Sequence, residues 1–210
     1  MSMKYTHVIF DIDGTLTDTE KYVLESLADV VRAHTGRAET AESLRFALGI
    51  PGNEAFRMIG FEEENFAQYM AEWEAGLRAF NDQIDIFPGG RELVAALEMR
   101  GVKLGIATSK NRDQYDKDFG RFDVAEKFMV SVTADDSQTH KPTAGPLLRY
   151  MELTGAKPEE MLYIGDSVYD AMCAQAAGVD FALATWGTSD MGIAARYKPD
   201  SLMDLLKMIQ

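Results

Sequence analysis

The chain has 210 residues, 46% of them apolar, which is enough for about one domain or slightly more with a sizeable core. Its 21 basic and 34 acidic residues give a net charge of −13, which disfavours nucleic acid and anionic membranes as partners. There is no apolar run long enough for a membrane span, no signal-peptide pattern, and too few cysteines for an internal disulfide. We expect a globular cytoplasmic protein that can still hold a local pocket for a small anion.

The first expected elements are a short strand and a set of helices. Residues 6–10 are apolar and β-branched, which is typical of a buried strand. Apolar residues at helical spacing then run from an N-cap at Asp18 or Thr19 to Gly36. Further helices are expected as two short ones in 40–60, interrupted at 49–52, and a long amphipathic one over 66–80.

From Pro88 onward the pattern alternates between helices and strands. A helix ends at Gly101, and Lys141 with Pro142 is expected to begin another. Alternation of this kind predicts right-handed crossovers and a parallel sheet with helices on both faces. The strands are expected at 102–107, 128–132, 162–164 and 181–184, joined by the first strand at 6–10.

Residues with reactive side chains follow several of these strands. Because an open parallel sheet binds its ligand at the carboxyl ends of its strands, we expect these residues to meet at one edge. They are the segments Asp11-Ile12-Asp13-Gly14-Thr15 and Thr108-Ser109-Lys110, then Lys141, and Gly165-Asp166-Ser167 with Asp170 one turn later.

Clustered carboxylates repel one another unless a cation lies among them, and Mg²⁺ with oxygen ligands is the usual ion beside phosphates. Lys141 and Thr108 suit the oxygens of a phosphoryl group. Asp11 could attack phosphorus and form an aspartyl-phosphate. Asp13 is placed to protonate the leaving oxygen and later to activate water.

In this order the motifs resemble those of the haloacid dehalogenase superfamily, over nearly all of residues 5–209. The segment 11–15 is similar to the first motif, Thr108 to the second, Lys141 to the third and 165–170 to the fourth. The resemblance implies an α/β fold: a Rossmann-like parallel sheet core, 1–16 plus 86–210, with a small α-helical cap inserted as 17–85.

The resemblance also implies a role for each motif residue. Asp11 is the nucleophile and a Mg²⁺ ligand, and Asp13 is the general acid and base with its backbone carbonyl on the metal. Asp166 ligates the metal, while Asp170 supports it from close by. The predicted contacts to the phosphoryl group and substrate are Thr108, Ser109 and Lys141 from the core, with Arg45, Gly49 and Asn53 from the cap.

Departures from the subgroup patterns narrow the reaction. True dehalogenases and the phosphonate-cleaving branch lack the second acid of the first motif, which is Asp13 in this chain. Thr17-Asp18-Thr19 is similar to the sugar phosphomutases, but Tyr22-Val23 stands where that branch has a histidine. The segment 49–52 and Trp186-Gly187 look more like phosphoglycolate-type phosphatases.

We therefore predict a Mg²⁺-dependent phosphatase for a small phosphorylated metabolite such as phosphoglycolate, acting as a monomer or dimer. A β-phosphoglucomutase-like sugar phosphomutase, a pyrophosphatase and a nucleotidase remain alternatives within the superfamily. A receiver-type signalling module, which accepts phosphate on aspartate, is an alternative of another class, although receivers are compact and lack a large insert. The roles of His140 and Trp186 are left open.

Overall fold

The computed structural model describes residues 4–209 and is built around one five-stranded sheet. All strand pairs are parallel, in the order β3-β2-β1-β4-β5, which confirms the predicted α/β class. In the register, Phe10 lies between Ile106 and Ile164. The strands are β1 (His7–Phe10), β2 (Lys103–Ala107), β3 (Val130–Val132), β4 (Met161–Gly165) and β5 (Asp180–Leu183).

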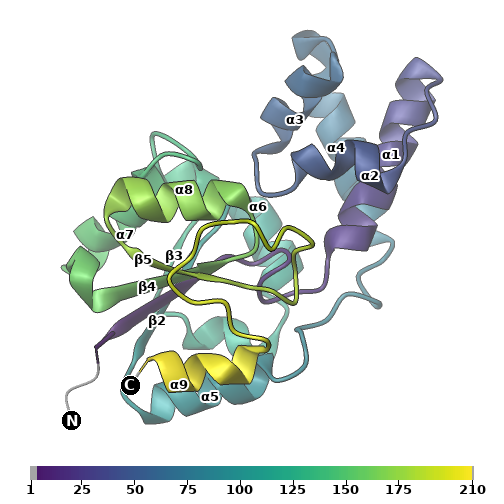
Figure 1. Cartoon of the computed structure of the whole chain (residues 1–210). Coiled ribbons are helices and arrows are strands. Elements are labelled where there is room, and N and C mark those ends of the chain that lie inside the picture. The colour runs from purple at the N-terminus through teal and green to yellow at the C-terminus, as the bar shows by residue number, and fades with distance from the viewer. Residues whose placement is uncertain (1–3, 210) are drawn as a thin grey trace.

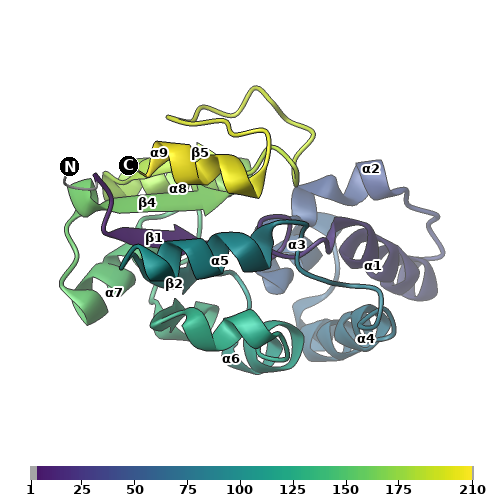
Figure 2. The same ribbon diagram turned by 90° about the horizontal axis from the view of Figure 1, so that it is seen from below.

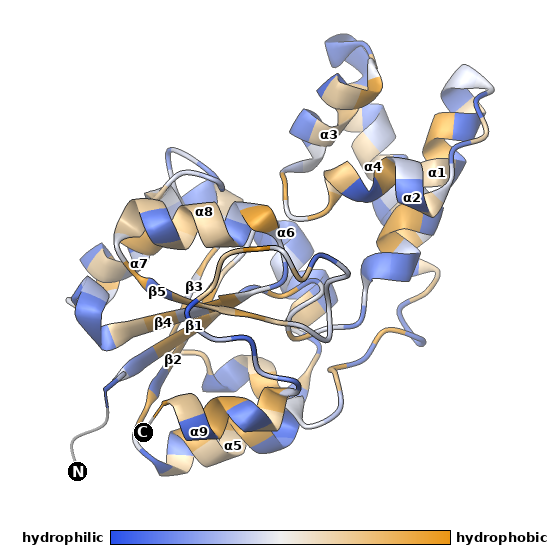
Figure 3. Cartoon of the chain, viewed as in Figure 1, coloured by the Kyte–Doolittle hydropathy of each residue, from blue (hydrophilic) through white to orange (hydrophobic). Residues whose placement is uncertain are grey.

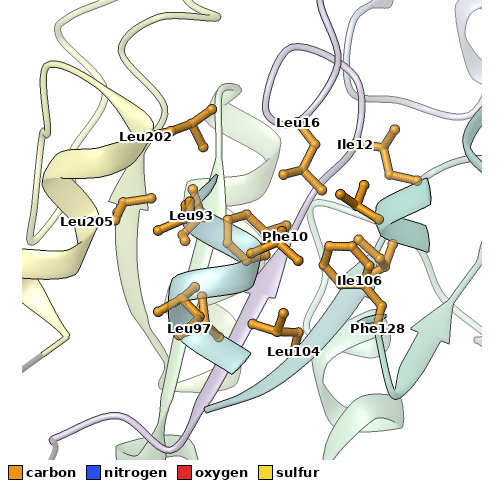
Figure 4. Close-up of a cluster of buried hydrophobic side chains, with 14 of the residues drawn as sticks. Phe10, Ile12, Leu16, Leu93, Leu97, Leu104, Ile106, Phe128, Leu202 and Leu205 are labelled. Carbon is orange, nitrogen blue, oxygen red and sulfur yellow. The ribbon is translucent and has the colours of Figure 1, made fainter. Parts of the chain in front are cut away.

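Helices cover both faces of the sheet (Figure 1). On one face lie α5 (Gly90–Met99) and α9 (Leu205–Met208), and on the other lie α7 (Gly145–Thr154) and α8 (Val168–Ala177). Side chains alternate along each strand, so β1 contributes Val8 and Phe10 to the first face and Ile9 to the second. Figure 4 shows Phe10 packed among leucines of α5 and the C-terminal segment.

The helices that follow β1 form a separate group beyond one end of the sheet (Figures 1 and 2). They have their own buried cluster, which includes Leu27 and Phe56, and they carry both polar and apolar residues along their length (Figure 3). We call this group the helical insert: α1 (Glu20–Thr35), α2 (Ala41–Leu44), α3 (Gly52–Ile59) and α4 (Phe66–Arg78).

Most of the predicted strand boundaries differ from the structure by one or two residues, and one helix begins later than predicted. The third strand begins at Val130 rather than at 128, two residues after the end of a 3₁₀ helix, Asp123–Lys127. The helix expected to begin at Lys141 begins at Gly145 instead. A residue before proline is disfavoured in helical conformation, so Lys141 lies in the loop before α7. Between β2 and β3 the short α6 (Arg112–Gln114) continues as one π-helical segment, Tyr115–Phe119.

Candidate active site

Three buried carboxylates and one lysine meet at the carboxyl ends of β1 and β4. Asp11, Asp166 and Asp170 each place a carboxylate oxygen within 4.8 Å of the other two. The Lys141 Nζ lies 2.9 Å from Asp11 Oδ1 and 2.7 Å from Asp170 Oδ1, and its side chain is only 1% exposed. The strand order reverses between β1 and β4, which is where an open α/β sheet binds ligands.

The turn after β1 requires a glycine to bring these groups together. Gly14 has a φ of +75°, and a Cβ there would come within 2.4 Å of the Asp166 Oδ2. An L side chain at this position would therefore be strained and would also displace the carboxylate. The next residue, Thr15, donates its hydroxyl hydrogen to Asp166 Oδ1 at 3.2 Å. The Asp-Gly-Thr sequence thus fixes Asp166 as well as turning the chain.

The three carboxylates differ in electrostatic environment. Burial raises the pKa of Asp11, and the charge of Lys141 only partly opposes that shift. Burial and the charges of Asp170 and Asp11 raise the pKa of Asp166 well above its usual value. Burial would also raise the pKa of Asp170, but the charge of Lys141 and hydrogen bonds from Lys141, Ser167 and Tyr163 hold it below the usual value.

These carboxylates fit a divalent cation. Their oxygens lie close together, and burial and mutual repulsion disfavour their charged forms. A hard divalent cation bound among them would stabilise those charged forms. Both oxygens of Asp170 are already engaged. Oδ1 accepts from Lys141 and from the Tyr163 hydroxyl, each at 2.7 Å, and Oδ2 accepts from the backbone and side chain of Ser167. The predicted supporting role of Asp170 therefore suits its contacts better than direct ligation.

A second lysine holds the other carboxylate of the first motif. The Lys110 Nζ lies 3.1 Å from Asp13 Oδ2 and 3.0 Å from Asp118 Oδ2. Burial lowers the pKa of Lys110, yet the charges of Asp13 and Asp118 outweigh burial and raise it. Lys110 is therefore a charged group that fixes Asp13. The sequence placed Lys110 beside the site but gave no reason to pair it with Asp118, a residue on the π-helical segment.

Two buried side-chain oxygens beside Lys110 make no hydrogen bond within the described residues. They are Asp13 Oδ1 and the hydroxyl of Thr19. Both residues line a cavity of about 10 Å³ beside Lys110, which is roughly the space needed for one water molecule. Thr19 occupies the N-cap position of α1 as expected, but its side chain accepts no capping hydrogen bond. Its hydroxyl is instead buried beside the second catalytic candidate.

The cavity that contains the candidate catalytic carboxylates lies between the helical insert and the sheet. Its volume is about 100 Å³, and its floor contains Asp11 and Asp13. Of the other predicted contacts, Thr108, Ser109 and Gly49 line this cavity. The Thr108 hydroxyl accepts a hydrogen bond from the backbone of Lys110, 3.2 Å away. Lys141 contacts Asp11 from below the cavity floor rather than lining the cavity.

Arg45 and Asn53 are predicted substrate contacts that the structure does not bring to this cavity. The Arg45 guanidinium pairs with Glu20 at 2.8 Å and lines a separate open groove that also contains Trp186. Asn53 is exposed on the first turn of α3. The direction of each side chain depends on how the short helices pack, which their sequence spacing could not indicate. The Trp186 indole donates to the Thr15 carbonyl oxygen at 2.9 Å and so supports the turn after β1.

Comparison with known proteins decides the family. The model of the family described as haloacid dehalogenase-like hydrolase matches residues 8–184. The chain belongs to this family. It is 30% identical to the putative pyrophosphatase PpaX of Caldanaerobacter subterraneus, over 99% of this chain and 96% of that protein. It is 29% identical to the pyrophosphatase PpaX of Bacillus cereus, over 96% of this chain and 93% of that protein.

Solved structures agree with this assignment to the haloacid dehalogenase-like hydrolases. The crystal structure of a putative phosphoglycolate phosphatase from Lactobacillus plantarum matches with a TM-score of 0.89 and 30% identity, covering 98% of this chain and all of that one. A haloacid dehalogenase-like hydrolase from Bacteroides fragilis matches with a TM-score of 0.86 and 27% identity, covering 96% of this chain and 100% of that one. The predicted superfamily and fold are confirmed. In the described residues no helix is long and apolar enough to cross a membrane.

Proposed function

We propose that this hydrolase is a Mg²⁺-dependent phosphatase that acts on a small phosphomonoester through an aspartyl-phosphate. The observation that carries the proposal is the placement of Asp11 and Asp13. Both carboxylates line one small cavity, while Lys141 holds the first from below and Lys110 holds the second from the side. The names of the relatives, pyrophosphatase and phosphoglycolate phosphatase, support the same reaction class.

Each half of the reaction uses these two carboxylates. An oxygen of Asp11 attacks phosphorus, and the bond from phosphorus to the leaving oxygen breaks while Asp13 donates a proton to that oxygen. Asp13 then removes a proton from water, whose oxygen attacks phosphorus and releases Asp11. Lys141 keeps Asp11 oriented, and the Thr108 hydroxyl can donate to a phosphoryl oxygen.

The cation belongs beside the same carboxylates. Asp11, Asp166 and the backbone carbonyl of Asp13 would hold Mg²⁺, with Asp170 positioning Lys141. When bound, Mg²⁺ would neutralise charge on the phosphoryl oxygens and align the attack. We assign no ligand role to His140.

The helical insert completes the cavity. We propose that residues 17–85 act as a cap domain on a core of 1–16 and 86–210. The loop at Gly49 and Ile50 and one side of α4 form the wall opposite Asp11. A wall of this kind excludes water and contacts the leaving group, so the cap would set substrate choice.

Phosphate release tests the proposed function directly. We expect many turnovers of p-nitrophenyl phosphate with Mg²⁺ and none with EDTA. The variant Asp11→Asn should lose turnover because an amide cannot form the acyl-phosphate, and its circular dichroism spectrum should match the wild type. Stoichiometric labelling without release would instead favour a receiver-type module. Sustained turnover by Asp11→Asn would contradict the covalent mechanism.

A further inference from the structure

Apart from the carboxylates of its floor, the cavity at Asp11 and Asp13 is walled largely by apolar side chains. They come from α1, from the loop before α3 and from one side of α4, so the helical insert supplies them. The Trp73 indole N–H is not available to a ligand, because it donates to the Val23 carbonyl oxygen at 3.0 Å. The larger apolar lining residues are Val23, Leu48, Ile50, Met70, Trp73 and Leu77.

Charge in the wall is mostly negative. Glu74 and Asp118 line the cavity in addition to Asp11 and Asp13. Lys110 is the one cationic residue among the described residues that line it, and its Nζ is shared between Asp13 and Asp118. A second anionic group of a substrate would therefore have to displace one of these carboxylates to gain a positive partner.

The neutral polar groups of the wall are also engaged. The Gln114 amide nitrogen donates to Glu74 at 2.9 Å, and its amide oxygen accepts from the backbone of Asn111. The Ser109 hydroxyl donates to the Gly49 carbonyl oxygen at 3.0 Å. Among these groups an anion that leaves water would find no cation that is not already paired with carboxylates, and burying an unpaired charge is strongly unfavourable.

From this chemistry we infer that the leaving group of the substrate is uncharged and largely apolar, rather than a second phosphate or a carboxylate. The inference rests on the proposed phosphatase function and specifies its substrate class. It separates this chain from the activities printed in its relatives' names, because pyrophosphate and phosphoglycolate both present a second anionic group.

The test compares substrates of the same shape and different charge. The leaving group of phosphoglycolate carries a carboxylate. Its amide (2-amino-2-oxoethyl phosphate) has an uncharged polar leaving group of the same shape, and isobutyl phosphate has an uncharged apolar one. With Mg²⁺ present, we expect kcat/KM for the two esters with uncharged leaving groups to exceed that for phosphoglycolate and for pyrophosphate by at least about 10-fold. This ratio corresponds to about 1.4 kcal/mol. A smaller ratio, or a preference for phosphoglycolate or pyrophosphate, would overturn the inference.

One variant tests whether the wall causes the preference. Ile50→Lys adds a cation to the lining, and we expect the ratio of kcat/KM for phosphoglycolate over its amide to rise at least about 10-fold. The matched control is Met58→Lys, which places the same charge on an exposed position of α3 outside the cavity, and its ratio should stay at the wild-type value. An unchanged ratio in a folded Ile50→Lys protein would contradict the assignment of the wall.

The two proposals fail in different ways. If p-nitrophenyl phosphate and the panel are all inert with Mg²⁺, the phosphatase function is wrong, and the substrate class is wrong with it. If p-nitrophenyl phosphate is hydrolysed but phosphoglycolate or pyrophosphate is preferred, only the inference about the leaving group is wrong.

Discussion

The Ser109 hydroxyl donates a hydrogen bond to the Gly49 carbonyl oxygen at 3.0 Å, and so joins the loop after β2 to the loop before α3. Gly49 also lies against a second serine of the core. Its φ is +79°, and a Cβ there would come within 2.8 Å of the Ser167 Oγ. The helical insert therefore meets the loops at the edge of the sheet through a backbone position that favours glycine, in the lining of the cavity that contains Asp11 and Asp13.

Removing this hydrogen bond should weaken the closed arrangement of the site. A neutral hydrogen bond contributes about 0.5–1.5 kcal/mol, so Ser109→Ala should lower kcat/KM by roughly 2- to 12-fold. Steady-state kinetics on a neutral ester measures this change. Ser201→Ala is the control, because it removes a hydroxyl that donates to Asp204, far from the cavity. Equal kinetics in the two variants would show that the Ser109 contact has no role in closing the site.

Asp13 is the residue assigned to proton transfer. Asp13→Ala should reduce kcat by at least about 10²-fold, because both leaving-group protonation and water activation depend on its carboxylate. The loss should be smaller for an ester with an acidic leaving group, such as p-nitrophenyl phosphate, which departs without full protonation. A rate near that of the wild type for alkyl esters would exclude Asp13 as the acid and base.

Asp166 and Asp170 should respond differently to loss of charge. Asp166→Asn is expected to raise the Mg²⁺ concentration for half-maximal activity by at least about 10-fold, as loss of a ligand would. Asp170→Asn should mainly lower kcat, by about 10- to 100-fold, because its oxygens hold Lys141 and Tyr163. Mg²⁺ titrations of both variants measure this difference. A shift in Mg²⁺ requirement for Asp170→Asn as large as for Asp166→Asn would make Asp170 a direct ligand.

The raised pKa of Asp11 links stability to pH in the metal-free protein. Its folded-state pKa of about 7 lies above the ordinary value of 3.8. The stability associated with the neutral form is therefore complete below about pH 4 and is lost as pH rises through 7. In EDTA, Asp11→Asn should be more stable than the wild type at pH 8, by up to a few kcal/mol, with a smaller gain at pH 4.5.

Thermal melts at the two pH values measure the effect of Asp11→Asn. Exposed Asp82 provides the control, since Asp82→Asn should change the melting temperature little at either pH. Mg²⁺ should raise the melting temperature of the wild type more at pH 8 than at pH 4.5, because ionised carboxylates bind the cation. A gain in Asp11→Asn that is independent of pH would contradict the raised pKa.

The sequence by itself determined the sheet and the residues at its carboxyl edge. Apolar runs such as 6–10 identify strands that are buried on both faces, and parallel strands bring the residues after their ends to one edge. Asp11, Asp166 and Lys141 therefore meet as expected, although they lie far apart in the chain. Predictions from local sequence were wrong at the ends of elements. For example, Pro142 keeps Lys141 out of the following helix.

Only the tertiary structure decided what faces the reactive carboxylates. The helical spacing of Met70, Trp73 and Leu77 predicts an apolar stripe on α4, but spacing cannot say whether that stripe covers a core or a cavity. The packing of the short helices pairs Arg45 with Glu20 and leaves it outside the cavity. The contact of Lys110 with Asp118 likewise depends on the course of the π-helical segment. Such side-chain directions follow from packing between elements, which local sequence patterns do not encode.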